Sequence, residues 1–153
     1  MIEQIARFLG LACTGLAAGI AVCVVLIDRN WSGTSRFYTE FKQLLIPRLT
    51  LPAPALGALG MVAVAINAAL LVQRGAGAAF GLAVASDLCG LAAMALTKFG
   101  HFPINDRILK WDPASPPGDW ASVHARWSAL HVARTIAALG SFGFFLLSTS
   151  LPG

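Results

Sequence analysis

The stretch WASVHARWSALHVARTIAALGSFGFFLL, residues 120–147, decides the fold of this chain, because it is long and apolar enough to cross a membrane as one helix. Its first half carries polar and aromatic side chains at spacings of four, three, four and three residues, which is the register of one helix face. Ionisable side chains inside a membrane are costly and usually functional. We therefore expect the chemistry of this protein along that face, at Trp120, His124, Trp127, His131 and Arg134.

The composition of the whole chain indicates an integral membrane protein. Its 153 residues are 57% hydrophobic and only 12% charged, with a mean hydropathy of +0.72, whereas a soluble domain carries about 25% charged residues. At this length we expect a single domain, residues 1–153. The basic residues are scattered along the chain, so nothing indicates a nucleic-acid partner, and membrane lipids are the expected surroundings.

Four segments are long enough to span the hydrocarbon core, which takes about 20 apolar residues. They cover residues 5–27, 55–72, 78–99 and 120–147. Only residues 73–77 separate the second segment from the third, as in a tight helical hairpin. The predicted fold is therefore all-α: an integral membrane, antiparallel four-helix bundle in which recurring glycines let the helices approach closely.

The distribution of basic residues predicts the orientation of the bundle. Four spans place both termini on one side and the two longer loops on the other. Because basic loops stay in the cytoplasm, we expect a bacterial inner-membrane protein with cytoplasmic long loops and outward-facing termini. The terminal side has only Arg7 and Arg74, whereas the long loops and their flanks hold Arg29, Arg36, Lys42, Arg48, Lys98, Arg107 and Lys110.

The first long loop contains a helical pattern of its own. Thr34 or Ser35 can cap its start, and Pro47 should stop it. We predict a short amphipathic helix at the membrane interface, and a role in anchoring the chain is favoured over a role as a substrate lid. The apolar residues that define the pattern are Phe37, Phe41, Leu44 and Leu45.

Each predicted span supplies a polar residue at a similar depth, about 17 to 21 Å from the end with the long loops at about 1.5 Å per residue. A carboxylate at that depth needs a partner or a proton. For Asp87 the first candidate partner is Arg134 and the second is His131. Such a pair could fix helix register only, or it could serve catalysis. The residues at this depth are Thr14, Asn67, Asp87, His131 and Arg134.

Metal binding has little support in the residue spacing. His124 and His131 are two helical turns apart, about 10.5 Å, which is too far for one metal ion. No HxH, HxxxH or CxxC motif is present. The predicted cofactor is therefore none, with haem or a metal ion held by His101, His124 or His131 as the alternative.

The stretch FPINDRIL, residues 102–109, followed by Trp120, Arg126-Trp127, His131 and Arg134, resembles the anthrone-oxygenase-like family of small four-span membrane proteins. The shared pattern is a Pro-Ile-Asn motif after the third helix, then a Trp, a second Trp, an Asn or His and an Arg on the fourth helix. The resemblance implies a cofactor-independent oxygenase. Such an enzyme oxidises an anthrone, a tricyclic phenol-ketone, to an anthraquinone with O2.

The resemblance also implies roles for individual residues. His131, or His124 as second choice, would be the base, with Asp87 tuning it. Arg134 and Asn105 would stabilise the substrate anion, and Trp120 and Trp127 would enclose its rings, with Asn67 also contacting the substrate. Two alternatives stay open: a non-catalytic protein that binds a lipid or another hydrophobic small molecule, and a haem- or metal-carrying membrane subunit. A homo-oligomer is compatible with each.

Overall fold

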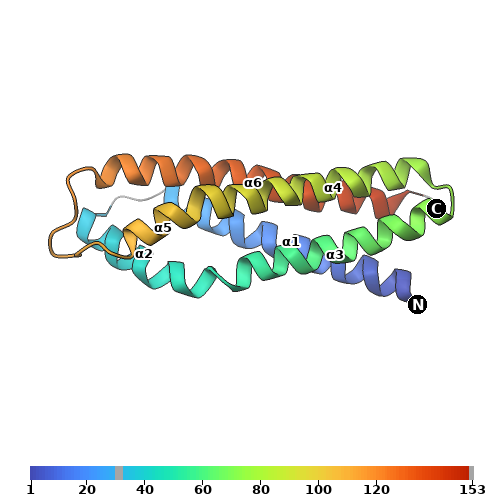
Figure 1. The fold of residues 1–153 in the computed structure, drawn as a ribbon, viewed down its shortest axis with the longest axis horizontal. Helices are drawn as coiled ribbons and strands as arrows, with labels where there is room; N and C mark the ends of the chain where they lie inside the picture. Colours follow the sequence, from blue (N-terminus) through green and yellow to red (C-terminus); the bar gives the residue numbers. More distant parts are fainter. Residues whose placement is uncertain (30–32, 152–153) are drawn as a thin grey trace.

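The computed structural model describes residues 1–29 and 33–151, and every long element in that part of the chain is a helix. Four long helical runs lie side by side in alternating directions, and both termini lie at the same end (Figure 1). The predicted all-α, antiparallel four-helix bundle is therefore confirmed. The elements are α1 (Ile2–Arg29), α2 (Ser35–Leu49), α3 (Pro52–Gln73), α4 (Gly77–Ala95), η1 (Leu96–His101), α5 (Phe102–Ile108) and α6 (Trp120–Ser150).

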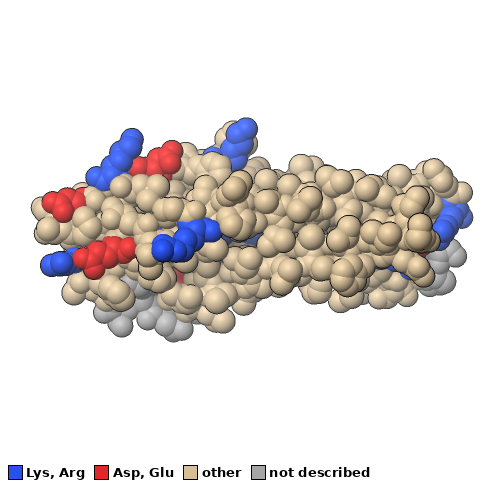
Figure 2. Space-filling model, turned by 90° about the horizontal axis from the view of Figure 1, so that it is seen from below, with Lys and Arg blue, Asp and Glu red and all other residues tan. Residues whose placement is uncertain are grey.

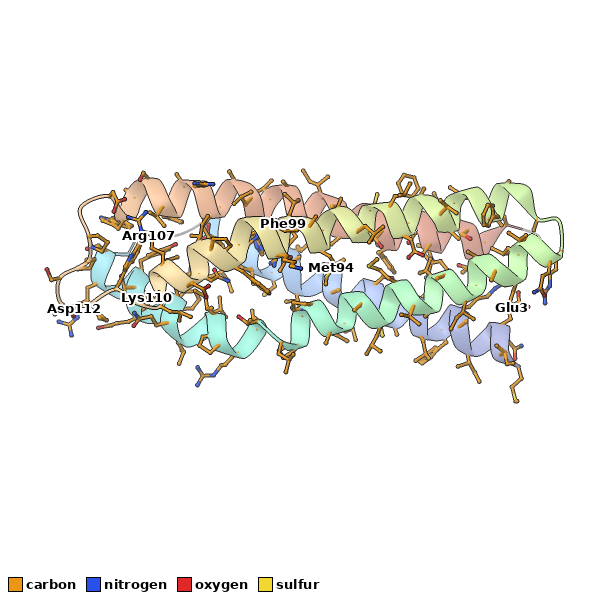
Figure 3. The ribbon with its side chains drawn as sticks, in the orientation of Figure 1. Glu3, Met94, Phe99, Arg107, Lys110 and Asp112 are labelled. Atoms are coloured by element: carbon orange, nitrogen blue, oxygen red, sulfur yellow. The ribbon has the colours of Figure 1, made fainter. Side chains whose placement is uncertain are left out.

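The surface of the bundle fits a hydrocarbon environment. The candidate membrane spans are α1, α3 with α2 before it, the run from α4 to α5, and α6. Large apolar side chains point outward along these helices, among them Phe8 and Ile136. Charged side chains gather at the end with the long loops, and a broad uncharged band separates them from the few at the other end (Figure 2). Figure 3 places Arg107, Lys110 and Asp112 at the first end and Glu3 at the second.

The helices surround a common centre. α1 packs against α3 and α6, and α4 also packs against α3 and α6. Apolar side chains fill the two ends of the bundle as separate clusters. The cluster at the loop end includes Tyr38, Ile108 and Trp127, and the cluster at the terminal end includes Val64, Leu71 and Phe145. The space between these two clusters holds the cavities described below.

The third span is longer than predicted. We expected it to end near Phe99, with Pro103 in a loop, but the helix continues through η1 and α5 to Ile108. Pro103 has no N–H to donate to the carbonyl of Phe99, and its ring crowds that carbonyl. The wider turns of the π-helix η1, which directly precede Pro103, accommodate this defect within a continuous helix. The motif Pro103-Ile104-Asn105 is therefore helical.

The helix predicted in the first long loop is confirmed, with Thr34 as its cap: the Thr34 side chain accepts a hydrogen bond from the backbone N–H of Phe37. Two details differ from the prediction. Pro47 lies inside α2, which ends at Leu49, and only residues 50–51 separate α2 from α3. The buried face of α2 is also different from the apolar pattern, because it consists of Tyr38, Thr39, Lys42 and Ile46.

A side chain of α2 fixes α2 to the end of α5. The amide nitrogen of Gln43 donates to the carbonyl of Trp111 over 2.9 Å and to that of Ile108 over 3.2 Å. Carbonyls at the end of a helix have no partner within the helix, so this side chain supplies one. α2 is therefore joined to the third span as well as to the second.

Candidate functional site

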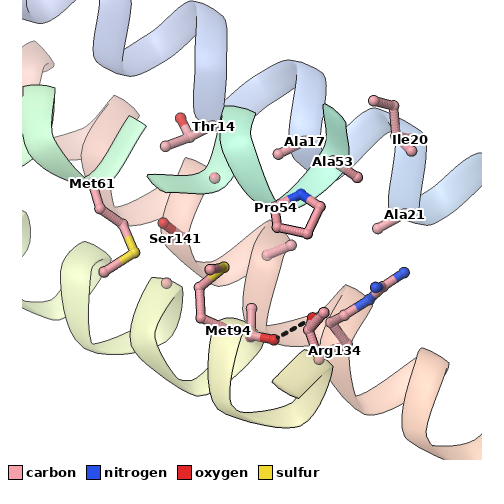
Figure 4. A pocket seen from close by; sticks show the side chains of 15 residues that line it. Thr14, Ala17, Ile20, Ala21, Ala53, Pro54, Met61, Met94, Arg134 and Ser141 are labelled. Atoms are coloured by element: carbon pink, nitrogen blue, oxygen red, sulfur yellow. Dashed lines mark hydrogen bonds between the residues drawn. The ribbon is translucent and has the colours of Figure 1, made fainter. Parts of the chain in front are cut away.

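Two adjoining cavities lie inside the bundle, among α1, α3, α6 and the run from α4 to α5. The aromatic cavity, of about 50 Å³, is lined among others by His101, Trp127 and His131. The small-residue cavity, of about 70 Å³, is lined mainly by alanine, glycine and methionine (Figure 4). The two spaces are neighbours, because both are bordered by Ile20, Ala53, Pro54, Thr97 and Arg134.

His131 has both ring nitrogens engaged. The guanidinium of Arg134 donates to its Nδ1 over 2.7 Å, and its Nε2 lies 3.1 Å from the carbonyl oxygen of Ala21. A guanidinium only donates and a carbonyl only accepts, so the proton of this imidazole is on Nε2 and the ring is neutral. The predicted base therefore has no free lone pair while Arg134 contacts it. In this state His131 orients Arg134.

Arg134 has no carboxylate partner among the residues that the structure describes. The predicted ion pair between Asp87 and Arg134 is wrong: Asp87 Oδ1 has no hydrogen-bond partner in the described part of the chain, and Asp87 lines neither cavity. An unpaired guanidinium beside an apolar cavity is costly, and it favours binding of an anion there.

Of the residues predicted at one depth, the structure brings only some together. Thr14 and Arg134 border the small-residue cavity, and His131 borders the aromatic cavity. Asn67 is 1% exposed and its amide atoms have no partner among the described residues, yet it lines neither cavity. Ser86, the neighbour of Asp87, bonds to Ser141, which lies seven residues beyond Arg134, so Asp87 and Arg134 are not at one level as predicted.

His101 supplies the free nitrogen that His131 lacks. Its Nδ1 lies 3.3 Å from the carbonyl oxygen of Leu96, five residues earlier in η1, so Nδ1 carries the proton. Its Nε2 is buried and has no hydrogen-bond partner in residues 1–29 and 33–151. The ring lines the aromatic cavity, and its centre lies 5.6 Å from that of His131. The sequence suggested His101 only as a metal or haem ligand.

Trp127 and Asn105, two of the residues predicted to contact a substrate, both line the aromatic cavity. The indole N–H of Trp127 donates to Asn105 Oδ1 over 2.9 Å, which leaves the Asn105 NH2 group as a donor. The indole also stacks on the His131 ring at 4.8 Å between centres, with 7° between the planes. Asn105, Trp127 and His131 thus hold one another in place.

His124 lies outside both cavities, in a buried charged cluster that the sequence did not reveal. Asp28 Oδ1 accepts from Lys42 Nζ over 2.9 Å, and Asp28 Oδ2 lies 3.2 Å from His124 Nε2. The side chains of Asp28 and Lys42 are 4% and 1% exposed. Lys42 Nζ also lies 3.1 Å from the centre of the Trp127 ring, a cation–π contact. Trp120, predicted to enclose substrate rings, stacks on His124 and likewise lines neither cavity.

Of the three histidines that were considered as ligands, His124 has a carboxylate within hydrogen-bond distance in the described residues, and His101 and His131 have none. In the described part of the chain, no three His, Cys, Asp or Glu side chains lie close enough together to hold a metal ion. The functional groups of the aromatic cavity are instead one free imidazole nitrogen, a guanidinium and an amide. Such a set can remove a proton from carbon and hold the resulting anion in an apolar space.

Comparison with known proteins agrees with the resemblance noted in the sequence. A family model described as anthrone oxygenase matches residues 41–144, about two thirds of the chain. The match contains His101, Asn105, Trp127, His131 and Arg134. No curated protein and no solved structure matches the chain.

Proposed function

The chain belongs to the anthrone oxygenase family, and we propose that it is a membrane oxygenase that works without a metal or organic cofactor. Its substrate would be a lipophilic carbon acid, an anthrone-like phenol-ketone, and its co-substrate O2. One observation carries this proposal: the partnerless Nε2 of His101 and the guanidinium of Arg134, which has no carboxylate partner in the described residues, border the same small cavity.

The first chemical step assigns a role to each of these groups. His101 Nε2 takes a proton from the benzylic CH2 group, whose anion is delocalised through the aromatic rings onto the carbonyl oxygen. The enolate oxygen is held by Arg134 and by the NH2 group of Asn105, because both are donors that border the cavity. Trp127 forms an apolar wall for the rings. His131 is a positioning residue, since its Nδ1 holds the Arg134 side chain.

The remaining steps use the electrons of the substrate itself. The carbanion gives one electron to O2, and the resulting carbon radical and superoxide combine to form a C–O bond. The peroxide anion takes up a proton from the protonated base. His101 then removes the second C–H proton, the O–O bond breaks, and the hydroxide that leaves takes up that proton as water. In total, one CH2 group and one O2 molecule give one ketone and one water molecule, so no external reductant is needed.

Substrate binding requires the aromatic cavity to widen. Its volume of about 50 Å³ is far below the roughly 300 Å³ of a small ligand pocket. Part of its wall is α2, through Leu45, Ile46 and Leu49. Because this wall is apolar and belongs to a separate short helix, we propose that a substrate enters by displacing it. The loop end that carries α2 would face the cytoplasm of a bacterial inner membrane, given its excess of basic residues.

Isotope incorporation tests the proposed function. The protein in lipid nanodiscs is incubated with an anthrone under 18O2, and the product is analysed by mass spectrometry. We expect one 18O atom in the new ketone, unchanged turnover after treatment with a chelator, and loss of turnover in Arg134→Gln. If a panel of phenolic ketones binds, as shown by quenching of tryptophan fluorescence, but gives no product, the protein is a non-catalytic binder of hydrophobic ligands instead.

A further inference from the structure

None of the chemical steps proposed for the aromatic cavity uses the small-residue cavity. We propose that it is the binding site for O2, an inference that rests on the proposed function. Its volume of about 70 Å³ exceeds the roughly 30 Å³ that one water molecule occupies in the liquid. Unlike the aromatic cavity, it has no residue of α2 in its wall that could move aside for a tricyclic substrate, so we assign it a small occupant.

The walls of this cavity favour an apolar guest. The hydroxyls of Thr14 and Thr97 are used within their own helices, as donors to Gly10 and Ala93 over 2.6 and 2.8 Å. The carbonyl of Ser141 accepts from Ser86 over 2.7 Å. Apart from the Arg134 guanidinium, the wall therefore has few free polar groups, and such a surface favours an apolar molecule. The other wall residues include Ala17, Gly57, Met61, Gly90, Met94 and Ala138.

The position of the cavity suits a co-substrate that arrives through the bilayer. It lies between α1, α3, α4 and α6, inside the candidate membrane spans (Figure 4). O2 is apolar and dissolves better in hydrocarbon than in water. The thioethers of Met61 and Met94 are flexible side chains that adapt their shape to a guest. An O2 molecule can therefore reach this site without crossing the polar loop end.

Arg134 borders both cavities and can stabilise an anion in either of them. Thr97 also borders both. When the enolate in the aromatic cavity gives one electron to O2 in the small-residue cavity, negative charge moves from the first space to the second. A guanidinium between them stays close to the anion throughout, first the enolate and then superoxide and the peroxide formed by C–O bonding. No other cation lines both cavities in the described part of the chain.

Filling the small-residue cavity should separate O2 binding from substrate binding. Ala138→Leu places extra carbon atoms in the cavity, whereas Gly90 is unsuitable because a Cβ there would meet Met61 at 2.9 Å. Ala133→Leu is the matched control, since Ala133 is exposed on the same helix. We expect Ala138→Leu to raise the KM for O2 about fivefold or more, with the KM for the anthrone and anaerobic enolate formation unchanged. Xenon should inhibit wild type competitively against O2.

Each outcome decides between the two proposals. If the anthrone gives neither enolate nor product in wild type, the proposed function fails. If wild type turns over but Ala138→Leu shows the O2 dependence of Ala133→Leu, and xenon does not compete, the O2 site is elsewhere and only this inference is overturned. Should Ala138→Leu fail to fold, Ala17→Leu fills the same cavity from α1, and competition by xenon in wild type needs no variant.

Discussion

Arg134 donates a hydrogen bond to Nδ1 of His131 over 2.7 Å, and His131 Nε2 in turn lies 3.1 Å from the carbonyl oxygen of Ala21 on another helix. This pair of contacts fixes one end of the guanidinium, and the Arg134 side chain borders both cavities. The two contacts also occupy both nitrogens of the histidine. The contact therefore assigns different roles to two side chains that the sequence placed together as acid–base candidates.

The first prediction tests whether His131 positions Arg134 or acts as a base. His131→Asn keeps an acceptor for the guanidinium, whereas His131→Leu removes it. If His131 is a positioning residue, His131→Asn should stay within about tenfold of wild-type kcat, and His131→Leu should lose about 100-fold or more, comparable to loss of an oxyanion donor. Steady-state turnover measures both. Equal inactivity of the two variants, with intact folding, would instead make the imidazole the base.

His101→Gln should abolish deprotonation of the substrate. Its Nε2 has no hydrogen-bond partner among the described residues, and loss of a general base typically costs about 100- to 10,000-fold in rate. The direct measurement is the absorbance of the enolate after anaerobic mixing with an anthrone, which precedes any reaction with O2. His124→Gln is the control, because His124 lines neither cavity. Enolate formation at the wild-type rate in His101→Gln contradicts the assignment.

Removal of the Arg134 charge should abolish turnover without lowering the free energy of unfolding. In Arg134→Met the cost of a charge in the membrane disappears, and the lost hydrogen bond to His131 is worth about 1 kcal/mol. We expect the free energy of unfolding to stay equal or to rise by about 1–2 kcal/mol, while turnover is lost. Thermal unfolding in the same detergent gives the first quantity. A marked loss of stability would mean that Arg134 is a structural residue.

Lys42→Met should have the opposite effect on stability. Its side chain is 1% exposed and pairs with Asp28, so the substitution leaves a buried carboxylate whose remaining partners in the described residues, His124 and Ser128, do not replace the lost charge. Breaking such a pair typically costs about 3–5 kcal/mol. The double variant Asp28→Asn with Lys42→Met removes both charges and should recover most of that loss. If the double variant is as unstable as the single one, packing of the Lys42 stem on Trp127 matters more than charge.

Much of the fold was predictable because it depends on local patterns. Apolar stretches of sufficient length marked the four spans, Trp120 was predicted as the first residue of the last one, and Thr34 was recognisable as a helix cap. α3 and α4, by contrast, are apolar nearly all round, so the sequence does not specify which face turns inward. Asn67 and Asp87 were consequently placed beside the wrong neighbours.

Contacts between segments far apart in the sequence could not be predicted from the periodicity of apolar residues. Lys42 was counted among the basic residues of the long loops, although it forms a buried pair with Asp28 between α2 and α1. His101 was judged by its spacing to other histidines, because an α-helical pattern gives no sign of the π-helix that turns it into the cavity. The nearby Pro103 was the only local signal of that distortion.

Pro103→Ala tests whether the π-helix is needed to place His101. Alanine restores an N–H that can bond to the carbonyl of Phe99, so η1 can relax toward a regular α-helix. In a regular helix each backbone N–H bonds to the carbonyl of the fourth residue before it, so the residues from Leu96 to His101 would rotate relative to α5. That rotation would break the contact between His101 Nδ1 and the carbonyl of Leu96. We expect an unchanged or higher unfolding temperature together with a fall in anaerobic enolate formation of about tenfold or more. Pro113→Ala, in the loop before α6, is the control. Normal enolate formation in Pro103→Ala would show that His101 reaches the cavity without the π-helix.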